Sequence, residues 1–387
     1  MKNILTLNAI SPKADVAFDD TYTVGSDVQN PVGIMLRSFN MHEYDLPADC
    51  IAVARAGAGT NNIPCDKYAD QGVVVFNTPG ANANAVKELV MAALLLGSRK
   101  IPEAIDWVKT LKGKGDEVGK LVEKGKGNFV GPEIIGKTLG IIGLGAIGAR
   151  VANAAVALGM DVVGYDPYLS VESALSMSRH VVRVNDLDTL IKNSDYISLH
   201  VPLLKDNKGF INDDMIAKMK DGVVIINAAR GELVDTDAIL AATKSGKVAR
   251  YVTDFPNDAL IGAENVVCIP HLGASTPEAE DNCAVMAAKQ LVDYIENGNI
   301  VNSVNYPSCS APRTGAMRIA IHHLNQQNMI AQMTAMVAAE HINIENMVNR
   351  SKGSYAYTII DTNTHVSEET VAKMTTVDGI LRIRVIH

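Results

Sequence analysis

The chain lacks the features that mark secreted, membrane-spanning and nucleic-acid-binding proteins. Its five cysteines are an odd number without Cys-x-x-Cys spacing, so we expect reduced thiols and neither a disulfide framework nor a metal site. No apolar run reaches the length of a membrane span, and the N-terminus has no signal-peptide pattern. A formal net charge of -8 argues against nucleic acid or an anionic membrane as the main partner. These absences favour a cytoplasmic globular protein.

The order of apolar runs predicts the organisation of the chain, whose 387 residues suffice for two or three domains. Strand-like and helix-like runs alternate over residues 1–300, which predicts an α/β fold with parallel sheets. Long helices are expected at 83–111 and 277–297. A segment with Pro, Ser and Gly at 305–316 is typical of a linker. The runs over 317–387 then predict a small ferredoxin-like βαββαβ module.

The run LGIIGLGAIG, over residues 139–148, is typical of a dinucleotide-binding turn. Gly143 would make the tight turn, Gly145 would leave room for a pyrophosphate, and Gly148 would let the next helix pack on the sheet. A second apolar run ends at Asp166, an acid that would bond the adenine ribose hydroxyls and repel a 2′-phosphate. A purely structural turn needs only the glycines, whereas strand, glycines, helix and acid in this order favour NAD as the cofactor.

Later segments carry ionisable residues where the strands of such a sheet should end. Interconversion of a 2-hydroxy acid and a 2-keto acid needs a cation for the carboxylate, a base near neutral pKa, and an acid that orients the base. Arg230 offers a fixed fork of donors, and His271 titrates in the required range. Asp254 and Asp258 lie between them in the sequence. Because ligands bind at the carboxyl ends of parallel strands, these side chains could meet at one site.

Several motifs together resemble those of the D-isomer-specific 2-hydroxyacid dehydrogenases: RAGAGTNNIP, GKTLGIIGLGAIG, SDYISLHVPL, INAARGELVDTDAI and IPHLGASTPEA. The resemblance implies a doubly wound Rossmann-type NAD domain inserted into a flavodoxin-like substrate domain, followed by a module that resembles an ACT domain. The expected divisions are 1–88 and 283–304 for the substrate domain, 89–282 for the NAD domain, 305–316 for the linker and 317–387 for the ACT-like module.

The resemblance also implies the catalytic roles. Arg230 corresponds to the substrate-binding arginine, His271 to the acid/base, and Asp254 to a ligand of the nicotinamide end. The family pairs its histidine with a glutamate a few residues after that aspartate. Here the segment is shortened to DFPNDAL, so the matching acid is expected to be Asp258, with Glu264 as the alternative. The further expected cofactor contacts are Ala146, Ile147, His200, Pro202, Ala228, Arg230, Gly273 and Ala274.

The small-molecule substrate implied by the resemblance is D-3-phosphoglycerate, oxidised to 3-phosphohydroxypyruvate. Arg37 and Ser38 in LRSF match the position that holds a substrate phosphate, and arginine suits that task. Backbone amides of Ala58 and Gly59 would bind the carboxylate, and Asn82 would be a further contact. A glyoxylate, hydroxypyruvate or D-lactate reductase on the same scaffold is the alternative enzyme. A dinucleotide-sensing protein like the corepressors of this fold is the alternative outside enzymology.

The C-terminal module has residues expected to bind an effector. In serine-sensing relatives a His, an Asn two residues later and an Asn on the next strand bind L-serine at a subunit interface. His323, Asn325 and Asn343 occupy these places, so the resemblance implies a homo-oligomer with an L-serine site. The Pro-Gly that usually opens the effector loop is replaced by Gln327 and Asn328, so the backbone loses the room that a glycine gives to a small ligand. A module that serves assembly alone is therefore an equal alternative to one that binds serine.

Overall fold

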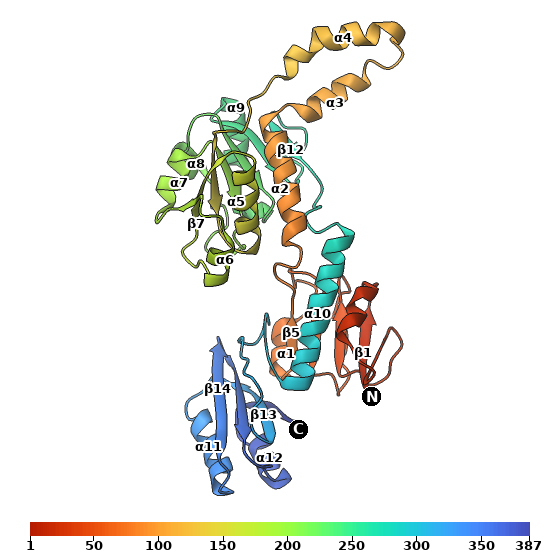
Figure 1. Cartoon of the computed structure of the whole chain (residues 1–387), viewed down its shortest axis with the longest axis vertical. Helices are drawn as coiled ribbons and strands as arrows, with labels where there is room; N and C mark the ends of the chain where they lie inside the picture. Colours follow the sequence, from red (N-terminus) through yellow and green to blue (C-terminus); the bar gives the residue numbers. More distant parts are fainter. The chain divides into compact units, whose positions relative to one another are not determined.

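The computed structural model describes residues 1–387, which form two compact units (Figure 1). Unit 1 comprises Met1–Ala81 and Glu280–His387, and unit 2 comprises Asn82–Ala279. The boundaries expected after residues 88 and 282 fall inside helices α2 (Ala83–Ser98) and α10 (Pro277–Asn297). In the structure, the boundary between the two units lies near the start of each of these helices.

A seven-stranded parallel sheet forms the centre of unit 2, in the order β12-β11-β10-β9-β6-β7-β8. This is the order of a doubly wound dinucleotide-binding sheet, in which a crossover to the far side separates the two halves. The strands are β6 (Thr138–Ile142), β7 (Asp161–Tyr165), β8 (Val181–Arg183), β9 (Tyr196–Leu199), β10 (Val223–Asn227), β11 (Val248–Thr253) and β12 (Val266–Cys268).

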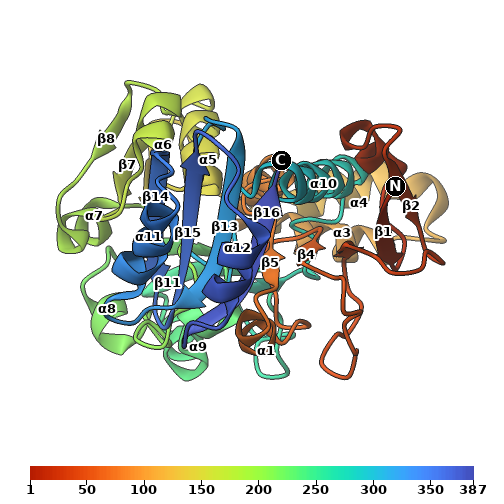
Figure 2. The same ribbon diagram turned by 90° about the horizontal axis from the view of Figure 1, so that it is seen from below.

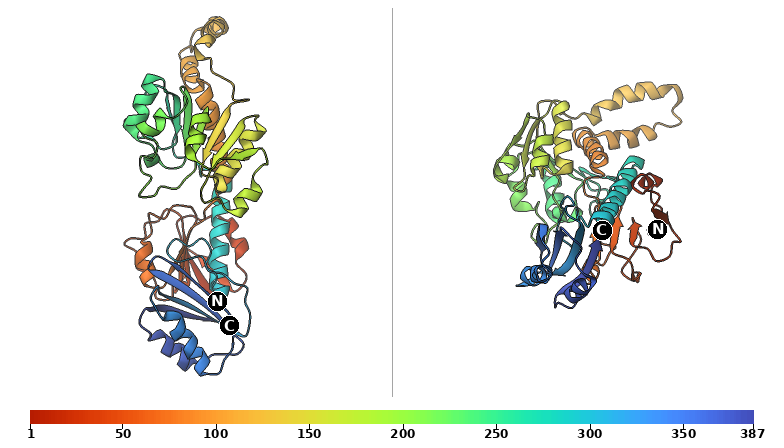
Figure 3. Two further views of the ribbon diagram at one scale, coloured as in Figure 1. Left: turned by 90° about the vertical axis from the view of Figure 1, so that its left-hand side faces the viewer. Right: turned by 60° about the horizontal axis from the view of Figure 1, so that its bottom comes forward.

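Helices cover both faces of this sheet (Figure 3). Successive side chains of a strand point to opposite faces, so Ile225 packs in one core and Ile226 in the other. The helices of one face are α2 and α5 (Ala146–Ala157), and those of the other are α7 (Leu187–Asn193), α8 (Asp213–Ala217) and α9 (Thr236–Ser245). The short helix α6 (Val171–Ser176) follows β7.

The single helix expected at 83–111 is wrong. The chain forms α2 and then a separate helix α3 (Ile101–Lys109), which is followed by α4 (Val118–Gly125). Pro102 lies at the start of α3, where a proline without an N–H is tolerated, whereas it would break a helix that continued through this point. None of the helices of the structure is both long and apolar enough to pass through a membrane.

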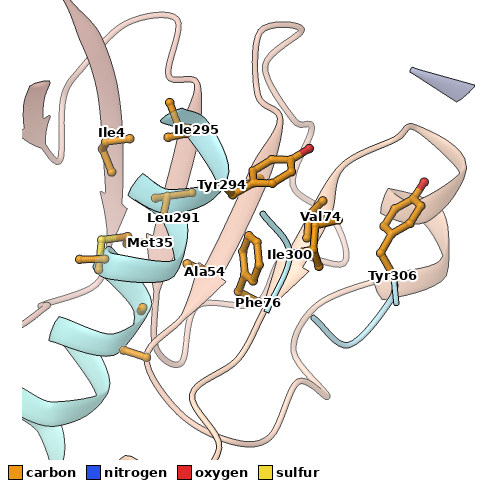
Figure 4. Close-up of a cluster of buried hydrophobic side chains, with 14 of the residues drawn as sticks. Ile4, Met35, Ala54, Val74, Phe76, Leu291, Tyr294, Ile295, Ile300 and Tyr306 are labelled. Atoms are coloured by element: carbon orange, nitrogen blue, oxygen red, sulfur yellow. The ribbon is translucent and has the colours of Figure 1, made fainter. Parts of the chain in front are cut away.

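The first sheet of unit 1 is parallel, in the order β2-β1-β3-β4-β5. Its strands are β1 (Lys2–Leu7), β2 (Tyr22–Gly25), β3 (Gly33–Leu36), β4 (Ala52–Arg55) and β5 (Val74–Phe76), and the helix α1 (Cys65–Asp70) precedes β5. Helix α10 packs on one face, where Leu291, Tyr294 and Ile295 contact the buried side chains of the strands (Figure 4). The strand order is that of a flavodoxin-like fold.

The C-terminal part of unit 1 has the expected βαββαβ order. Its antiparallel sheet, in the order β14-β15-β13-β16, has helices on one face (Figure 2). The elements are β13 (Met317–Leu324), α11 (Met329–Ala339), β14 (Ile344–Lys352), β15 (Tyr355–Thr362), α12 (Glu368–Thr375) and β16 (Ile380–Ile386). On the other face of the sheet, Ala320, Tyr357 and Ile359 share a core with α10.

Candidate active site

The glycine-rich turn connects β6 to α5 in unit 2. Gly143 has a φ of 95°, and a Cβ there would lie 2.5 Å from the carbonyl oxygen of His200. A Cβ at Gly148 would lie 2.0 Å from the carbonyl oxygen of Gly143, so only glycine allows the helix to start this close to the strand. Nothing lies within 4 Å of a Cβ at Gly145, the residue that precedes α5. The turn therefore leaves open space at a helix N-terminus, which suits an anionic group.

Asp166 follows β7 and is held beside this turn. One carboxylate oxygen accepts a hydrogen bond from the backbone N–H of Leu144 at 2.8 Å, and the other accepts one from Tyr168 at 2.8 Å. Each oxygen has a second lone pair that can accept from a hydroxyl. The turn and the acid together fit the pyrophosphate and ribose of a dinucleotide.

Asp254 follows β11 and is 1% exposed. Its Oδ1 atom is buried without a hydrogen-bond partner. Burial raises the pKa of the Asp254 carboxyl, and the charges of His271 and Arg230 and the N–H of Gly273 oppose that rise. Such an orphaned acceptor, in the same unit as the glycine-rich turn, is suited to accept from a ligand's amide group.

His271 follows β12 and lies in the same cavity as Asp254. The cavity has a volume of about 650 Å³ and is also lined by Gly231, Glu232 and Phe255. The Phe255 and His271 rings have centroids 4.5 Å apart and are tilted by 48°. The side chain of His271 is exposed, so its imidazole is available to a substrate.

Arg230 follows β10, and its position is set by the turn that carries it. The side-chain amide of Asn227 donates to the carbonyl of Arg230 at 2.9 Å, and Nη1 of Arg230 donates to the carbonyl of Ala229 at 2.6 Å. The guanidinium is exposed and near enough to Asp254 to act on its carboxyl. The structure thus brings a cation, a buried acid and an imidazole to one edge of the sheet.

No hydrogen bond joins His271 to either acid expected as its partner, and neither Asp258 nor Glu264 lines the cavity. The pairing therefore stays a prediction. Glu232 does line the cavity, and sequence reasoning missed it. Its place two residues after Arg230 in ARGELVD was the available signal.

The other expected cofactor contacts follow the carboxyl ends of strands in the same sheet. His200 follows β9, and its Nε2 lies 2.8 Å from Oγ of Ser198. Burial lowers the pKa of His200 to about 4, so the imidazole is neutral at physiological pH. The remaining expected contacts are Ala146 and Ile147 in α5, Pro202 after β9, Ala228 after β10, and Gly273 and Ala274 after β12.

Most of the expected substrate residues lie in unit 1. Arg37 and Ser38 follow β3, and Nη1 of Arg37 lies 2.5 Å from Oε1 of Glu280. Ala58 and Gly59 lie in the loop after β4, where the carbonyl of Ala58 accepts a hydrogen bond from Asn77 at 2.6 Å. The remaining expected substrate residue, Asn82, lies in unit 2. It is the N-cap residue of α2 and makes no side-chain capping hydrogen bond.

The three expected effector residues do not meet within one chain. Both ring nitrogens of His323 have partners in its own module, Leu324 O at 2.8 Å and Thr358 Oγ1 at 2.9 Å. Asn325 donates to the carbonyl of Gly353 at one end of β15. Asn343 precedes Ile344, which pairs with Thr362 at the opposite end of that strand.

Residues 91–273 match the family described as D-isomer specific 2-hydroxyacid dehydrogenase, NAD binding domain. The chain is 34% identical over 349 residues to a D-3-phosphoglycerate dehydrogenase of Haemophilus influenzae, with 87% of this chain and 81% of that protein covered. It is 32% identical over 350 residues to the Escherichia coli enzyme of the same name, with 87% and 82% covered. For an Archaeoglobus fulgidus relative of that name the values are 40% over 263 residues, 66% of this chain and 47% of the relative.

Solved structures show the same architecture. A D-2-hydroxyisocaproate dehydrogenase superposes with a TM-score of 0.63 at 26% identity, covering 79% of this chain and 100% of that one. An NAD⁺-bound 3-phosphoglycerate dehydrogenase of Entamoeba histolytica gives a TM-score of 0.60 at 25% identity, covering 79% and 98%.

Proposed function

The chain belongs to the D-isomer specific 2-hydroxyacid dehydrogenase family, and we propose that it oxidises D-3-phosphoglycerate to 3-phosphohydroxypyruvate, the first step of L-serine synthesis. It is an NAD-dependent enzyme with a small-molecule substrate. The observation that carries the proposal is the arrangement of Asp254 and His271 around one cavity, with Arg230 close by, at the edge of the sheet that carries the glycine-rich turn. The choice of substrate follows the relatives that are called D-3-phosphoglycerate dehydrogenase.

The residues of unit 2 have separate roles in cofactor binding, substrate binding and proton transfer. NAD, when bound, accepts a hydride from C2 of the substrate. The glycine-rich turn and Asp166 would hold its pyrophosphate and adenine ribose, and Asp254 its nicotinamide end. Arg230 binds the substrate carboxylate with two parallel hydrogen bonds and polarises the C2 oxygen. His271 removes the C2 hydroxyl proton, and a carboxylate, expected to be that of Asp258, stabilises the resulting imidazolium.

The phosphorylated substrate is proposed from unit 1. Arg37 and Ser38 would contact the phosphate, and the Ala58 and Gly59 amides the carboxylate, with Asn82 as an additional contact. An arginine at the carboxyl end of a strand is well suited to a phosphate because its guanidinium binds two oxygens at once.

The C-terminal segment is proposed to be an ACT-like module that joins copies of the chain into a homo-oligomer and binds L-serine. The βαββαβ order and the places of His323, Asn325 and Asn343 support this assignment. Because the last two lie at opposite ends of β15, a site that uses all three requires a second copy of the chain. This module lies outside the residues that match the family.

Steady-state assays test the activity. NADH formation is measured with 3-phosphoglycerate, glycerate and D-lactate, and NADH consumption with hydroxypyruvate and glyoxylate. We expect kcat/KM to be highest for 3-phosphoglycerate. Higher values for an unphosphorylated acid would assign the chain to the reductases of the same scaffold. NADH binding without turnover of any substrate would assign it to the dinucleotide-sensing proteins.

A further inference from the structure

The loop that follows β4 has two unused hydrogen-bond donors. The backbone N–H groups of Ala58 and Gly59 have no partner within the chain. Ala58 is exposed and Gly59 is half-buried, so solvent reaches this part of the loop. Successive backbone N–H groups in a turn can bind an anion, and the substrate carboxylate is the anion expected here. How well the loop binds it depends on the direction of the two N–H groups.

The direction of each N–H is set by the carbonyl of the preceding residue. The two groups share one planar trans peptide unit, in which they point in opposite directions. The carbonyl of Gly57 accepts a hydrogen bond from the backbone N–H of Thr78 at 3.1 Å. The carbonyl of Ala58 accepts one from Nδ2 of Asn77 at 2.6 Å. Two successive residues after β5 therefore fix the peptide units that contain the N–H groups of Ala58 and Gly59.

Asn77 is itself held by a closed ring of three hydrogen bonds. Its backbone N–H donates to the carbonyl of Asn302 at 3.3 Å. Nδ2 of Asn302 donates to Oε1 of Gln290 at 2.8 Å, and Nε2 of Gln290 donates to the carbonyl of Asn77 at 3.0 Å. Because a carbonyl can only accept, the ring admits one orientation of the Gln290 amide. The ring uses the backbone of Asn77 and leaves its side chain for Ala58.

The ring joins three segments of unit 1 that are far apart in the sequence. Asn77 follows β5, Gln290 lies in α10, and Asn302 lies in the segment after α10. That segment pairs with the end of β5 through an antiparallel bridge between Phe76 and Ser303. Asn302 has a φ of 58°, a left-handed conformation that asparagine adopts more readily than most residues. The backbone thus places all three residues without help from a ligand.

We propose that Asn77, Gln290 and Asn302 are positioning residues, which hold the N–H groups of Ala58 and Gly59 in the direction that binds the carboxylate of a 2-hydroxy acid. The inference rests on the proposed function of this loop. The loop binds the carboxylate in the substrate and in the transition state alike, so loosening the loop should act mainly on KM. A ring that only stabilised the fold would instead affect the unfolding midpoint and the active fraction.

Three variants open the ring at different bonds. Asn77→Ala removes the donor to the loop. Gln290→Ala removes the donor to the carbonyl of Asn77, and Asn302→Gly removes the Nδ2 donor but keeps a residue that tolerates the positive φ. Asn297→Ala is the matched control, because it removes a side-chain amide bond of 2.8 Å, to Asp293, within the same helix α10.

For each variant we measure kcat and KM for 3-phosphoglycerate and glycerate, and the Kd of NADH by fluorescence. Calorimetry with NADH present gives the Kd of oxamate, a small unreactive analogue of a 2-keto acid. Urea unfolding midpoints check that each variant folds. The two substrates carry the same carboxylate, so a defect in its binding should affect both equally.

We expect KM for both acids and the Kd of oxamate to rise together, by about five- to thirtyfold in Asn77→Ala and about three- to tenfold in Gln290→Ala and Asn302→Gly. The reason is that loosely held N–H groups bind a carboxylate less well. kcat should change less than KM does, and the Kd of NADH should not change. Asn297→Ala should behave as the wild type.

The double variant Asn77→Ala/Gln290→Ala tests the order of the residues. If Gln290 acts through Asn77, the double variant should have the KM of Asn77→Ala alone, whereas independent effects would multiply. Multiplied effects, or losses in stability and kcat with KM unchanged, would overturn this proposal alone. A wild type inactive on 3-phosphoglycerate would instead overturn the proposed function, and the Kd of oxamate would still test the positioning role.

Discussion

The phenol oxygen of Tyr294 lies 2.8 Å from Nε2 of His322, and both side chains are completely buried. Tyr294 belongs to the last turns of α10 and His322 to β13. The rings of Tyr306 and Tyr357 each have centroids 4.6 Å from that of His322. This contact therefore joins helix α10 to the C-terminal module through the core of unit 1.

The module also completes the end of α10. A helix leaves its last four carbonyls without partners inside the helix, and here two arginines of the module donate to three of them. Arg384 donates to the carbonyls of Tyr294 and Ile295 at 2.9 and 2.8 Å. Arg318 donates to that of Asn297 at 2.8 Å. The C-terminal module is thus part of what stabilises α10, and its removal should destabilise the sheet of strands β1–β5 on which α10 packs.

Tyr294→Phe is expected to lower the free energy of unfolding by about 1–3 kcal/mol, because it leaves the buried Nε2 of His322 without a partner. Tyr355→Phe is the matched control. It removes an exposed hydrogen bond of 2.6 Å to Asp70, and we expect it to cost about 0.5 kcal/mol or less. Urea unfolding measures both. Equal losses in the two variants would show that the Tyr294–His322 contact adds no more than a surface bond.

The same contact predicts a pH dependence of stability. Burial lowers the pKa of His322 well below its usual value, and the charges of Arg384, Arg382 and His323 lower it further. In the unfolded chain the pKa is about 6.5, so below that pH the unfolded state binds the extra proton and the folded state does not. The free energy of unfolding should therefore fall as pH drops from about 6.5.

His322→Gln removes this titration while leaving a polar group opposite Tyr294. Unfolding in urea at pH 7.5, 6.5 and 5.5 compares it with the wild type, and the difference between the two cancels the other titrating groups. We expect the wild type to lose more stability than the variant on acidification. Parallel pH profiles would mean that His322 does not titrate between the two states.

Asp166→Ala is expected to relax the preference for NAD over NADP, because the carboxylate that repels a 2′-phosphate is removed. Arg183 could then bind the 2′-phosphate of NADP, since its Nη2 lies 3.5 Å from the carbonyl oxygen of Asp166. The double variant Asp166→Ala/Arg183→Ala should gain less activity with NADP than the single one. Ratios of kcat/KM for the two cofactors measure this, and a wild type that uses both equally well would contradict the role given to Asp166.

His271→Ala should lower kcat by about two to four orders of magnitude and leave NADH binding, followed by fluorescence, unchanged. Asp258→Asn should also lower kcat, since a carboxylate partner orients the imidazole and stabilises the imidazolium that forms. Glu264→Gln and Glu232→Gln are the comparisons. A loss of kcat in one of these, with none in Asp258→Asn, would move the partner role to that residue.

The sequence predicts those features of this chain that depend on local pattern. Helix α10 begins and ends where its apolar spacing indicates, and the glycine turn follows a buried strand as expected. Features that depend on tertiary contact are not accessible in this way. Nothing local to Arg37 indicates that Glu280 lies beside it, and nothing local to His323 indicates that Thr358 uses its ring nitrogen. The break between α2 and α3 lies between these two cases. Pro102 is a local signal that ends the long helix, but the apolar spacing continues past it and favours a single helix.

The effector residues provide the last prediction. Asn325 and Asn343 lie at opposite ends of β15, an eight-residue strand about 25 Å long, so no single module can bring both to one serine. Two copies of the module related by a two-fold axis can do so, because such an axis places one end of a sheet beside the other end of its copy. We expect L-serine to bind only to the oligomer, and either Asn325→Ala or Asn343→Ala to abolish binding.

Complementation between these two variants tests the arrangement directly. In a mixed dimer of Asn325→Ala and Asn343→Ala chains, one interface site loses both asparagines and the other keeps both. Calorimetry of the mixed protein, refolded together, should therefore recover serine binding at reduced stoichiometry, while each variant alone shows none. Binding that survives in a single variant would place the site elsewhere. Sedimentation velocity checks the oligomeric state, and a wild-type oligomer that does not bind serine would leave the module with a role in assembly alone.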